Sequence, residues 1–349
     1  MQSETLEIFI RDINSIRDYI KYINLVNNIQ VDSRESDNKV LVDFSNHLYS
    51  FGVSKKLFEY KSITISLYGI LEKHIGVWIK EYINELPKIV FNYNDLPKNF
   101  RDNHFKLSLK LLALLSEGKM LKYEGIEKEV VLAKLNSCVE DPVNFHLNGD
   151  AFYLSSGNLK HAKIAEALNY LDIKLTPRLK VVGKRPENFL YRESVNIENK
   201  GNELFKLIDD LVTRRNDIAH GEDIDNILNI TEFNEYIDFL EGYGRAIYQI
   251  FIEKIIETEA CYLYKKIENV IGIYKSGSVL CFEIDNSTIR KGDIIIIKLQ
   301  DGSFDKKEIL GIQRNNKSFD ELVILTVENI GIDLGKGISK GQEFYIKKQ

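Results

Sequence analysis

Glycine and proline divide this chain into two parts of different character. The chain has 349 residues, with 21 glycines and five prolines. Nine of the glycines fall in the last 82 residues, whereas all five prolines lie before residue 267. Regularly spaced glycines are typical of short strands joined by turns, and a glycine-poor stretch favours long helices. We therefore expect an α-helical domain over residues 1–265 and a β domain over residues 268–349.

The first part carries apolar residues at helical spacing. The two longest helices expected near its start are 3–29 and 62–86, the second ended by Pro87. Further helices are expected at 105–115, 128–135, 159–171, 202–219 and 232–265. Gly242 and Gly244 indicate a bend in the last of these, or its division into a helix pair. The first domain is predicted to be a helical bundle.

After residue 267 the pattern changes to short β-branched runs separated by glycine. The expected strands are 270–274, 279–284, 293–299, 308–313, 322–327 and 343–346. Strands repeated at intervals of about ten residues are typical of a small barrel or sandwich. We expect a multidomain α-then-β chain that ends in a small β-barrel.

Composition narrows the possible functions and partners. The chain has 47 basic and 52 acidic residues and a net charge of −5, which excludes globally basic, histone-like binding of nucleic acid. The three cysteines are odd in number and far apart, so they favour a reducing cytoplasm over a disulfide framework. We expect no cofactor and no metal site. The apolar runs are too short to cross a bilayer, so we expect no membrane partner.

One segment, residues 207–221, holds residue types that suit RNA cleavage. Asn216 and His220 are four residues apart and share a ridge of the expected helix, Arg215 lies to the side, and Gly221 suits the helix end. Cleaving RNA through its own 2′-hydroxyl needs a proton acceptor, a proton donor for the leaving oxygen and a cation for the phosphorane. His220 fits the proton steps and Arg215 fits the phosphate, with no metal required.

A single imidazole cannot hold both protonation states at once. A symmetric pair of chains would supply two copies of His220 around one scissile phosphate, because in a twofold dimer the same surface faces itself. The sequence therefore predicts a composite site at a homodimer interface formed by this helix.

The segment Arg215-Asn216-Asp-Ile-Ala-His220 resembles the R-N-x-x-x-H motif of HEPN domains. Three surrounding segments are similar to the RiboL-PSP group of these domains: Tyr68-Gly-Ile-Leu-Glu72, Leu96-Pro-Lys-Asn-Phe100, and Asn158-Leu159 leading into Leu171-Asp-Ile173. The resemblance implies an all-α, dimeric, metal-independent endoribonuclease of a toxin or antiphage system, with Arg215, Asn216 and His220 at the motif positions. Some HEPN domains bind or scaffold without cutting, so a noncatalytic RNA- or translation-factor-binding adaptor is the alternative.

A basic segment at residues 174–192 is a second candidate for RNA contact. Six cations and one carboxylate give this segment a net charge of +5, and Phe189 and Tyr191 lie among the cations. Such a composition suits phosphate tracking and base stacking, although a solvated loop explains it equally well. The RNA-binding residues predicted here are Lys180, Lys184, Arg185 and Arg192, together with Arg214 of the motif helix.

The last part resembles the second domain of translational GTPases. The turns Ile289-Arg-Lys-Gly-Asp293 and Ile338-Ser-Lys-Gly-Gln342 occur in the order expected for that barrel. No phosphate-binding loop of the type GxxxxGK[ST] accompanies them, so the chain itself is not expected to be a GTPase. The resemblance implies contacts with tRNA, the ribosome or a translation factor, and an antitoxin is another possible partner. A generic barrel for protein contacts or dimer support is the alternative.

Overall fold

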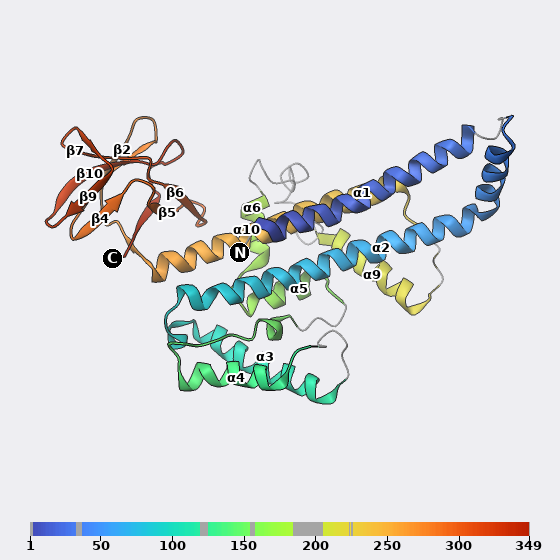
Figure 1. The fold of residues 1–349 in the computed structure, drawn as a ribbon, viewed down its shortest axis with the longest axis horizontal. Helices are drawn as coiled ribbons and strands as arrows, with labels where there is room; N and C mark the ends of the chain where they lie inside the picture. Colours follow the sequence, from blue (N-terminus) through green and yellow to red (C-terminus); the bar gives the residue numbers. More distant parts are fainter. Residues whose placement is uncertain are drawn as a thin grey trace. The chain divides into compact units, whose positions relative to one another are not determined.

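The computed structural model describes residues 3–32, 37–118, 125–153, 158–183, 205–222, 224 and 226–348 (Figure 1). The chain forms two compact units. The helical unit comprises Met1–Asn84, Pro97–Glu140 and His146–Ile250. The strand-rich unit comprises Glu85–Leu96, Asp141–Phe145 and Phe251–Gln349. Lys184, Arg185 and Arg192 of the predicted RNA-binding set lie outside the described residues.

Long α-helices account for most of the chain before residue 263. They are α1 (Ser3–Asp32), α2 (Lys39–Ile89), α3 (Lys98–Glu117), α4 (Lys128–Glu140), α5 (His161–Asn169), α6 (Leu175–Gly183), α9 (Lys206–His220) and α10 (Ile230–Tyr262). Two short 3-10 turns, η2 (Tyr93–Asp95) and η4 (Gly149–Phe152), lie in the connections. The helical character predicted for this part is confirmed.

Several of these helices differ from the prediction. Helix α6 was not predicted, and α3 begins at Lys98, before the predicted residue 105. Helix α2 begins at Lys39, far before the predicted residue 62, and continues past Pro87 to Ile89. Pro87 lacks the N–H that would bond to the Ile83 carbonyl, but only two helical residues follow it.

Helix α10 is one continuous helix through Gly242 and Gly244. Gly244 has a packing role: a Cβ atom there would lie 2.3 Å from Cζ of Phe9, so its absence lets the Phe9 ring rest on the α10 backbone.

The core of the helical unit forms where α1, α2 and α10 meet. Trp78 of α2 is fully buried, with Phe9 of α1 and Tyr248 of α10 edge-on against it at centroid distances of 5.3 and 5.6 Å. Arg17 of α1 is hydrogen-bonded to Asp238 and Glu241 of α10, each at 2.5 Å. These contacts join the consecutive helices α1 and α2 to α10, which lies far from both in the sequence.

A buried histidine ties η4 to α3. The Asn148 backbone N–H donates to Nε2 of His104 at 3.1 Å, and the Asn148 side chain donates to Ser108 and to the Val131 carbonyl. His104 is fully buried, and this burial lowers its pKa to about 4. His104 is therefore neutral in the folded protein at pH 7 and acts as an acceptor.

The strand-rich unit contains β1 (Tyr264–Lys266), β2 (Asn269–Tyr274), β3 (Val279–Ile284), β4 (Ser287–Arg290), β5 (Ile294–Lys298), β6 (Phe304–Glu308), β7 (Gly311–Arg314), β8 (Lys317–Phe319), β9 (Glu321–Ile324), β10 (Glu328–Asp333) and β11 (Glu343–Lys347). They pair antiparallel in sheets of order β1-β11-β5-β6, β2-β3-β10-β7-β8 and β4-β9. In the described strands none of these sheets closes on itself, so the predicted closed barrel is not found.

The three sheets are held together by one shared apolar core. They are not joined by a continuous ring of backbone hydrogen bonds, as the strands of a closed barrel would be. Phe282 of β3, Ile289 of β4 and Ile297 of β5 are buried together in a single apolar cluster. On the opposite face of β5, Ile296 packs with Ile256 of α10. Because β5 is buried on both faces, its Ile-Ile-Ile-Ile run lacks the alternation of a half-exposed strand. The glycine-separated pattern predicted the strand-rich character of this part, but it missed β1, β4, β8 and β10 and did not determine how the strand edges pair.

None of the described helices is both long enough and apolar enough to cross a membrane.

The low pKa of His104 predicts a loss of stability in mild acid. In the unfolded chain an ordinary histidine takes up a proton near pH 6.5, whereas folded His104 resists protonation until about pH 4. Its contribution to folding is therefore complete above pH 6.5 and declines as the pH falls toward 4. Thermal unfolding followed by the fluorescence of Trp78, the one tryptophan, should show a falling midpoint over this range.

His104→Gln should make that pH dependence less steep, and the part that remains comes from other buried histidines such as His161, whose pKa is also lowered to about 4. The exposed His146→Gln should leave the pH dependence as in the wild type. Equal slopes for wild type and His104→Gln would show that other groups control the acid response.

Candidate functional site

Helix α9 presents the motif residues on one packed element. Ile208, Leu211 and Val212 are buried, so the apolar stripe of the helix faces the helical unit. The helix ends at Gly221, whose φ of 72° is a left-handed conformation that glycine adopts without strain. The Glu222 N–H then donates to the Asp217 carbonyl at 3.0 Å. This cap makes the exposed His220 the last helical residue, open to a ligand in solution.

Arg215 lies over the ring of Tyr68 on α2. Its guanidinium carbon is 4.8 Å from the ring centroid, and Nη1 donates to Oδ1 of Asn216 at 3.2 Å. Tyr68 is buried, and this burial raises its pKa to about 12, assisted by the nearby Glu72 carboxylate. A neutral phenol thus offers the π-face that attracts a cation. Tyr68 and Asn216 together orient the planar donor fork that suits phosphate.

Arg214 has a different environment from Arg215. Nε pairs with Asp210 at 2.6 Å, and Nη1 donates to the Asn226 carbonyl at 2.8 Å and to the Tyr60 hydroxyl at 3.3 Å. Asp210 also accepts a hydrogen bond from Tyr236 of α10. The Asp210 and Tyr60 contacts raise the pKa of Arg214 against the effect of burial. This placement favours a structural role for Arg214 over the predicted RNA contact.

The other predicted cation within the described residues is exposed. Lys180 lies on α6 with its side chain in solvent, in the basic segment that precedes α9. It therefore remains available to a polyanion, in contrast to Arg214.

Another cluster joins α9 to α5, α6 and α10 through His161. Its Nδ1 lies 2.9 Å from the Tyr243 hydroxyl and its Nε2 lies 3.0 Å from Oγ1 of Thr176. The ring stacks on Phe205, and the His161 backbone N–H donates to Asp209 at 2.9 Å. Burial lowers the pKa of His161 to about 4, with Asp209 opposing the shift. His161 is therefore a neutral residue near pH 7 that holds neighbouring segments together.

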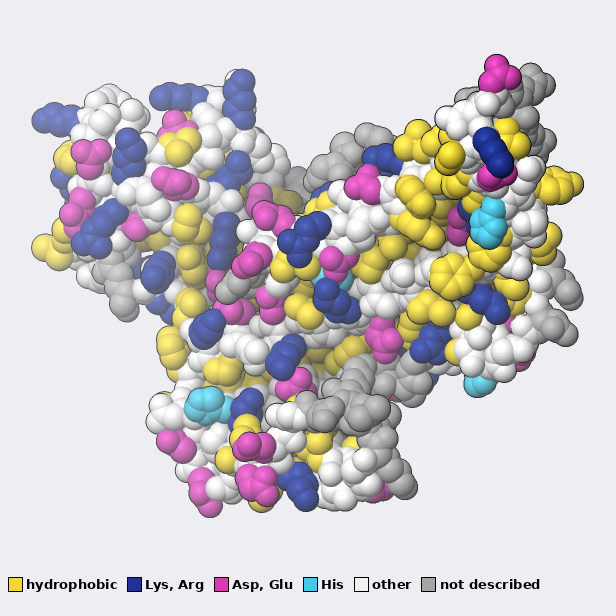
Figure 2. Space-filling view, turned by 45° about the vertical axis from the view of Figure 1, so that its right-hand side comes forward, with side chains coloured by type: hydrophobic (Ala, Val, Ile, Leu, Met, Phe, Trp, Pro, Cys, Tyr) yellow, Lys and Arg dark blue, Asp and Glu magenta, His cyan; other side chains and the backbone are white. Residues whose placement is uncertain are grey.

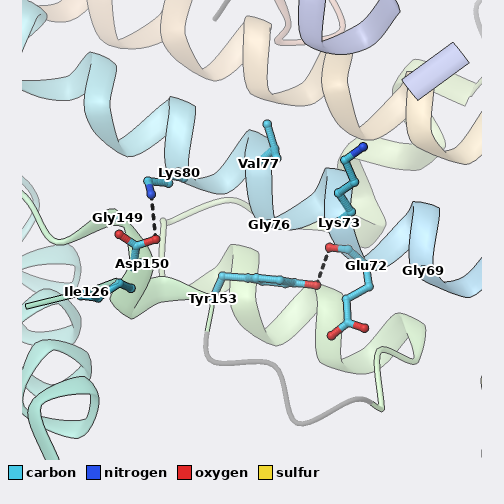
Figure 3. Close-up of a pocket in the computed structure, with 10 residues that line it drawn as sticks. All are labelled: Gly69, Glu72, Lys73, Gly76, Val77, Lys80, Ile126, Gly149, Asp150 and Tyr153. Atoms are coloured by element: carbon cyan, nitrogen blue, oxygen red, sulfur yellow. Dashed lines mark hydrogen bonds and ion pairs between the residues drawn. The ribbon is translucent and has the colours of Figure 1, made fainter. Parts of the chain in front are cut away.

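A cleft of about 440 Å³ opens along α2, one helical turn beyond Tyr68 (Figure 3). Glu72 lies at its edge, and the Tyr153 hydroxyl donates to the Glu72 carbonyl at 2.7 Å. A Cβ atom on Gly76 would lie 2.6 Å from the Tyr153 ring, so this glycine lets the ring rest on the helix.

The charges around this cleft are balanced. Lys80 pairs with Asp150 at 2.9 Å, and Lys73 pairs with Asp12 at 2.9 Å. Since both ammonium groups are paired with carboxylates, the cleft suits an uncharged polar group, such as a base, better than a phosphate. Among the described residues no group of three or more His, Cys, Asp or Glu is placed to hold a metal ion.

The sequence pointed to Arg215, Asn216 and His220, and the structure places all three on the second half of α9. It did not point to Tyr68 or Glu72 as parts of the site, although both belong to a segment that resembles the HEPN pattern. The available signal was that Tyr68 and Glu72 are polar residues four apart on a largely apolar helix. That Tyr68 lies beneath Arg215 could be seen only from the way α9 packs on α2.

A comparison with protein-family models matches residues 9–253 to the RiboL-PSP-HEPN family. The match covers more than half of the chain, so this protein belongs to the RiboL-PSP-HEPN family. HEPN domains are often ribonucleases, and they commonly bind RNA and dimerise. Searches of curated proteins and of solved structures find no match. The matched range ends before the strands, and the resemblance to the second domain of translational GTPases is not confirmed.

The different environments of the two arginines predict different effects on stability. Arg214→Ala removes an ion pair and two further hydrogen bonds, so it should lower the free energy of unfolding by about 2 kcal/mol. Arg215→Ala removes the contact with the Tyr68 ring and the hydrogen bond to Asn216 from a half-buried side chain, and it should cost about 1 kcal/mol. Urea unfolding followed by Trp78 fluorescence measures both. A larger loss for Arg215→Ala would contradict the assignment of Arg214 as the structural arginine.

Proposed function

We propose that this protein is a metal-independent endoribonuclease that cuts RNA at a composite site built from two copies of α9. The observation that carries the proposal is the arrangement of the motif helix. Its arginine is held between a buried tyrosine and an asparagine, and its histidine stands exposed at the capped helix end. Membership of the RiboL-PSP-HEPN family supports an RNA-related function.

The proposed reaction needs only the substrate's own nucleophile. One His220 accepts the proton of the 2′-hydroxyl, whose oxygen attacks the adjacent phosphorus. The P–O5′ bond breaks, and the leaving 5′-oxygen takes a proton from the imidazolium of the second His220. The products are a 2′,3′-cyclic phosphate and a 5′-hydroxyl end. Arg215 stabilises the negative charge of the phosphorane, and Asn216 orients the guanidinium.

The basic segment before α9 is proposed to bind the RNA backbone beside the cut. Lys180 is the exposed cation of α6, and Lys184, Arg185 and Arg192 extend the predicted set. Phosphate contacts of this kind make binding dependent on salt. We propose tRNA or ribosomal RNA as the substrate and arrest of translation, as in toxin or antiphage systems, as the outcome in a cytoplasm.

Purified protein should cleave tRNA or ribosomal RNA in the presence of EDTA and leave cyclic-phosphate ends. His220→Ala should lower the rate at least about 100-fold, because it removes the proton acceptor and donor. Arg215→Lys should also lose most activity, since an ammonium cannot reproduce the planar fork. Sequencing of RNA ends after incubation with each variant gives both the cut site and the loss.

His146→Ala is the matched control, because His146 is also exposed but lies outside α9. It should keep wild-type activity. Full activity in His220→Ala would overturn the proposed site. Specific RNA binding without any cleavage would instead support the alternative, a noncatalytic adaptor.

A further inference from the structure

Two glycines line the cleft along α2, seven residues apart on one face of the helix (Figure 3). Seven residues are close to two helical turns, so Gly69 and Gly76 follow one another along that face. Glycine inside a helix lowers the stability of the helix, because it loses more backbone freedom on folding than any other residue. Each of these two glycines therefore needs a reason in the structure.

Gly76 makes room for a ring of the same chain. A Cβ atom there would lie 2.6 Å from Cδ1 and Cε1 of Tyr153, so the missing side chain lets the aromatic ring rest on α2. The Tyr153 hydroxyl extends along the helix and donates to the Glu72 carbonyl at 2.7 Å. This contact shows what a glycine on this face of α2 accommodates, namely a flat ring.

Gly69 has no comparable neighbour. A Cβ atom there would meet no atom of the described residues within 4 Å, and Gly69 is exposed. It lies inside a continuous helix, so a left-handed backbone does not require glycine either. The backbone at Gly69 is therefore open to a group from outside the chain, on the same face that accepts the Tyr153 ring at Gly76.

This open backbone lies directly beside the arginine of the motif. The guanidinium carbon of Arg215 is 4.8 Å from the ring centroid of Tyr68, the residue before Gly69. In RNA a phosphate and its base are joined through a single ribose. A strand whose phosphate contacts Arg215 therefore has a base within reach of Gly69.

The lining of the cleft suits a base better than a second phosphate. Tyr153, Val77 and Ile126 supply apolar surface, and the ammonium groups of Lys73 and Lys80 are each paired with a carboxylate. Unstacked RNA bases bind in this way, with their faces against aromatic or apolar surface and their edges against polar groups. The volume of about 440 Å³ lies within the roughly 300–1,000 Å³ of small-molecule pockets, so a base and its ribose have room.

We propose that the end of the cleft beside Gly69 binds one nucleobase of the RNA strand whose phosphate contacts Arg215. The base lies flat on the backbone at Gly69. Its polar edge faces Glu72 and Lys73, which lie with Gly69 at the hydroxyl end of Tyr153 (Figure 3). The identity of the strand rests on the proposed nuclease function, whereas binding of the base does not depend on cutting. Because a base stacked in a duplex cannot enter the cleft, the subsite selects positions at which the base is unpaired.

Gly52 offers a matched control position on the same helix. A Cβ atom at Gly52 likewise meets no described atom within 4 Å. Gly52 precedes Gly69 by 17 residues, which is about 25 Å along the helix axis. It lies in the first half of α2, at the end of the helical unit where apolar side chains gather on the surface (Figure 2). A substitution there changes the helix in the same way but leaves the cleft intact.

Binding of uncleavable RNA tests the subsite without any measurement of cleavage. A short single strand with 2′-O-methyl groups has no 2′-hydroxyl to attack phosphorus, and an abasic strand of the same length keeps the phosphates but lacks the bases. In fluorescence anisotropy with the full chain, Gly69→Leu should bind the base-bearing strand about tenfold more weakly than the wild type, because the leucine takes the place of one stacked base. Gly69→Leu should bind the abasic strand as the wild type does.

Two further variants separate the subsite from an effect on folding. Gly52→Leu should bind both strands with wild-type affinity. Both leucine variants should unfold at a higher urea concentration than the wild type, because leucine forms helix better than glycine. Gly69→Ala, which adds a single methyl group, should show the same selective loss of binding to a smaller degree.

Equal weakening of both strands by Gly69→Leu would overturn the subsite, because the change would then act on the phosphates. Wild-type binding of the base-bearing strand by Gly69→Leu would overturn it as well. Competition by free nucleosides as strong as that by the RNA strand would assign the cleft to a small molecule and reject the RNA base.

Selective loss of base-bearing RNA by Gly69→Leu, in a protein that cuts no RNA, would uphold the subsite and reject the nuclease. Cleavage of RNA that Gly69→Leu leaves unchanged would do the reverse. The two proposals therefore fail separately.

Discussion

The contact between Arg215 and the buried ring of Tyr68 connects the proposed site on α9 to the core of the helical unit. Tyr68 lies on the same helix as Trp78, and Trp78 packs against both α1 and α10. The orientation of the guanidinium therefore depends on a helix whose own position is set by a buried aromatic cluster. Arg214 adds a second attachment through Asp210 and Tyr60, which fixes the rotation of α9 on α2. Because these contacts hold α9 on α2, the C-terminal end of α9 stays in position while His220 is exposed to solvent.

The two neighbouring arginines illustrate how packing assigns roles to similar residues. In sequence, Arg214 and Arg215 are equivalent cations beside one asparagine. In the structure, one is paired with a carboxylate and two further oxygens, while the other lies over a ring and beside Asn216. The histidines divide in the same way. His104 and His161 are held neutral by burial and bind neighbouring segments, whereas His220 is exposed. Of these three histidines, only His220 is open to a substrate.

Helix α2 carries both a buried apolar surface and an exposed apolar surface. Its buried side carries Tyr60, Tyr68 and Trp78, and a different side carries phenylalanines at seven-residue spacing. A bundle helix that already has its partners has no need of a second apolar stripe, and exposed aromatic residues at this period cost solvation.

The sequence by itself determined the helical character of the first part, the strand-rich character of the last part and the three motif positions on one helix. These features depend on local spacing, on glycine and proline, and on side-chain chemistry, all of which are visible in a single chain. The continuous α2 and α10 helices, the open sheets around a shared core and the partners of Arg214 and Arg215 were decided only by the tertiary structure. Each of these depends on residues distant in sequence, such as Phe9 resting on Gly244 or Tyr68 beneath Arg215, and local periodicity carries no information about which distant surfaces meet.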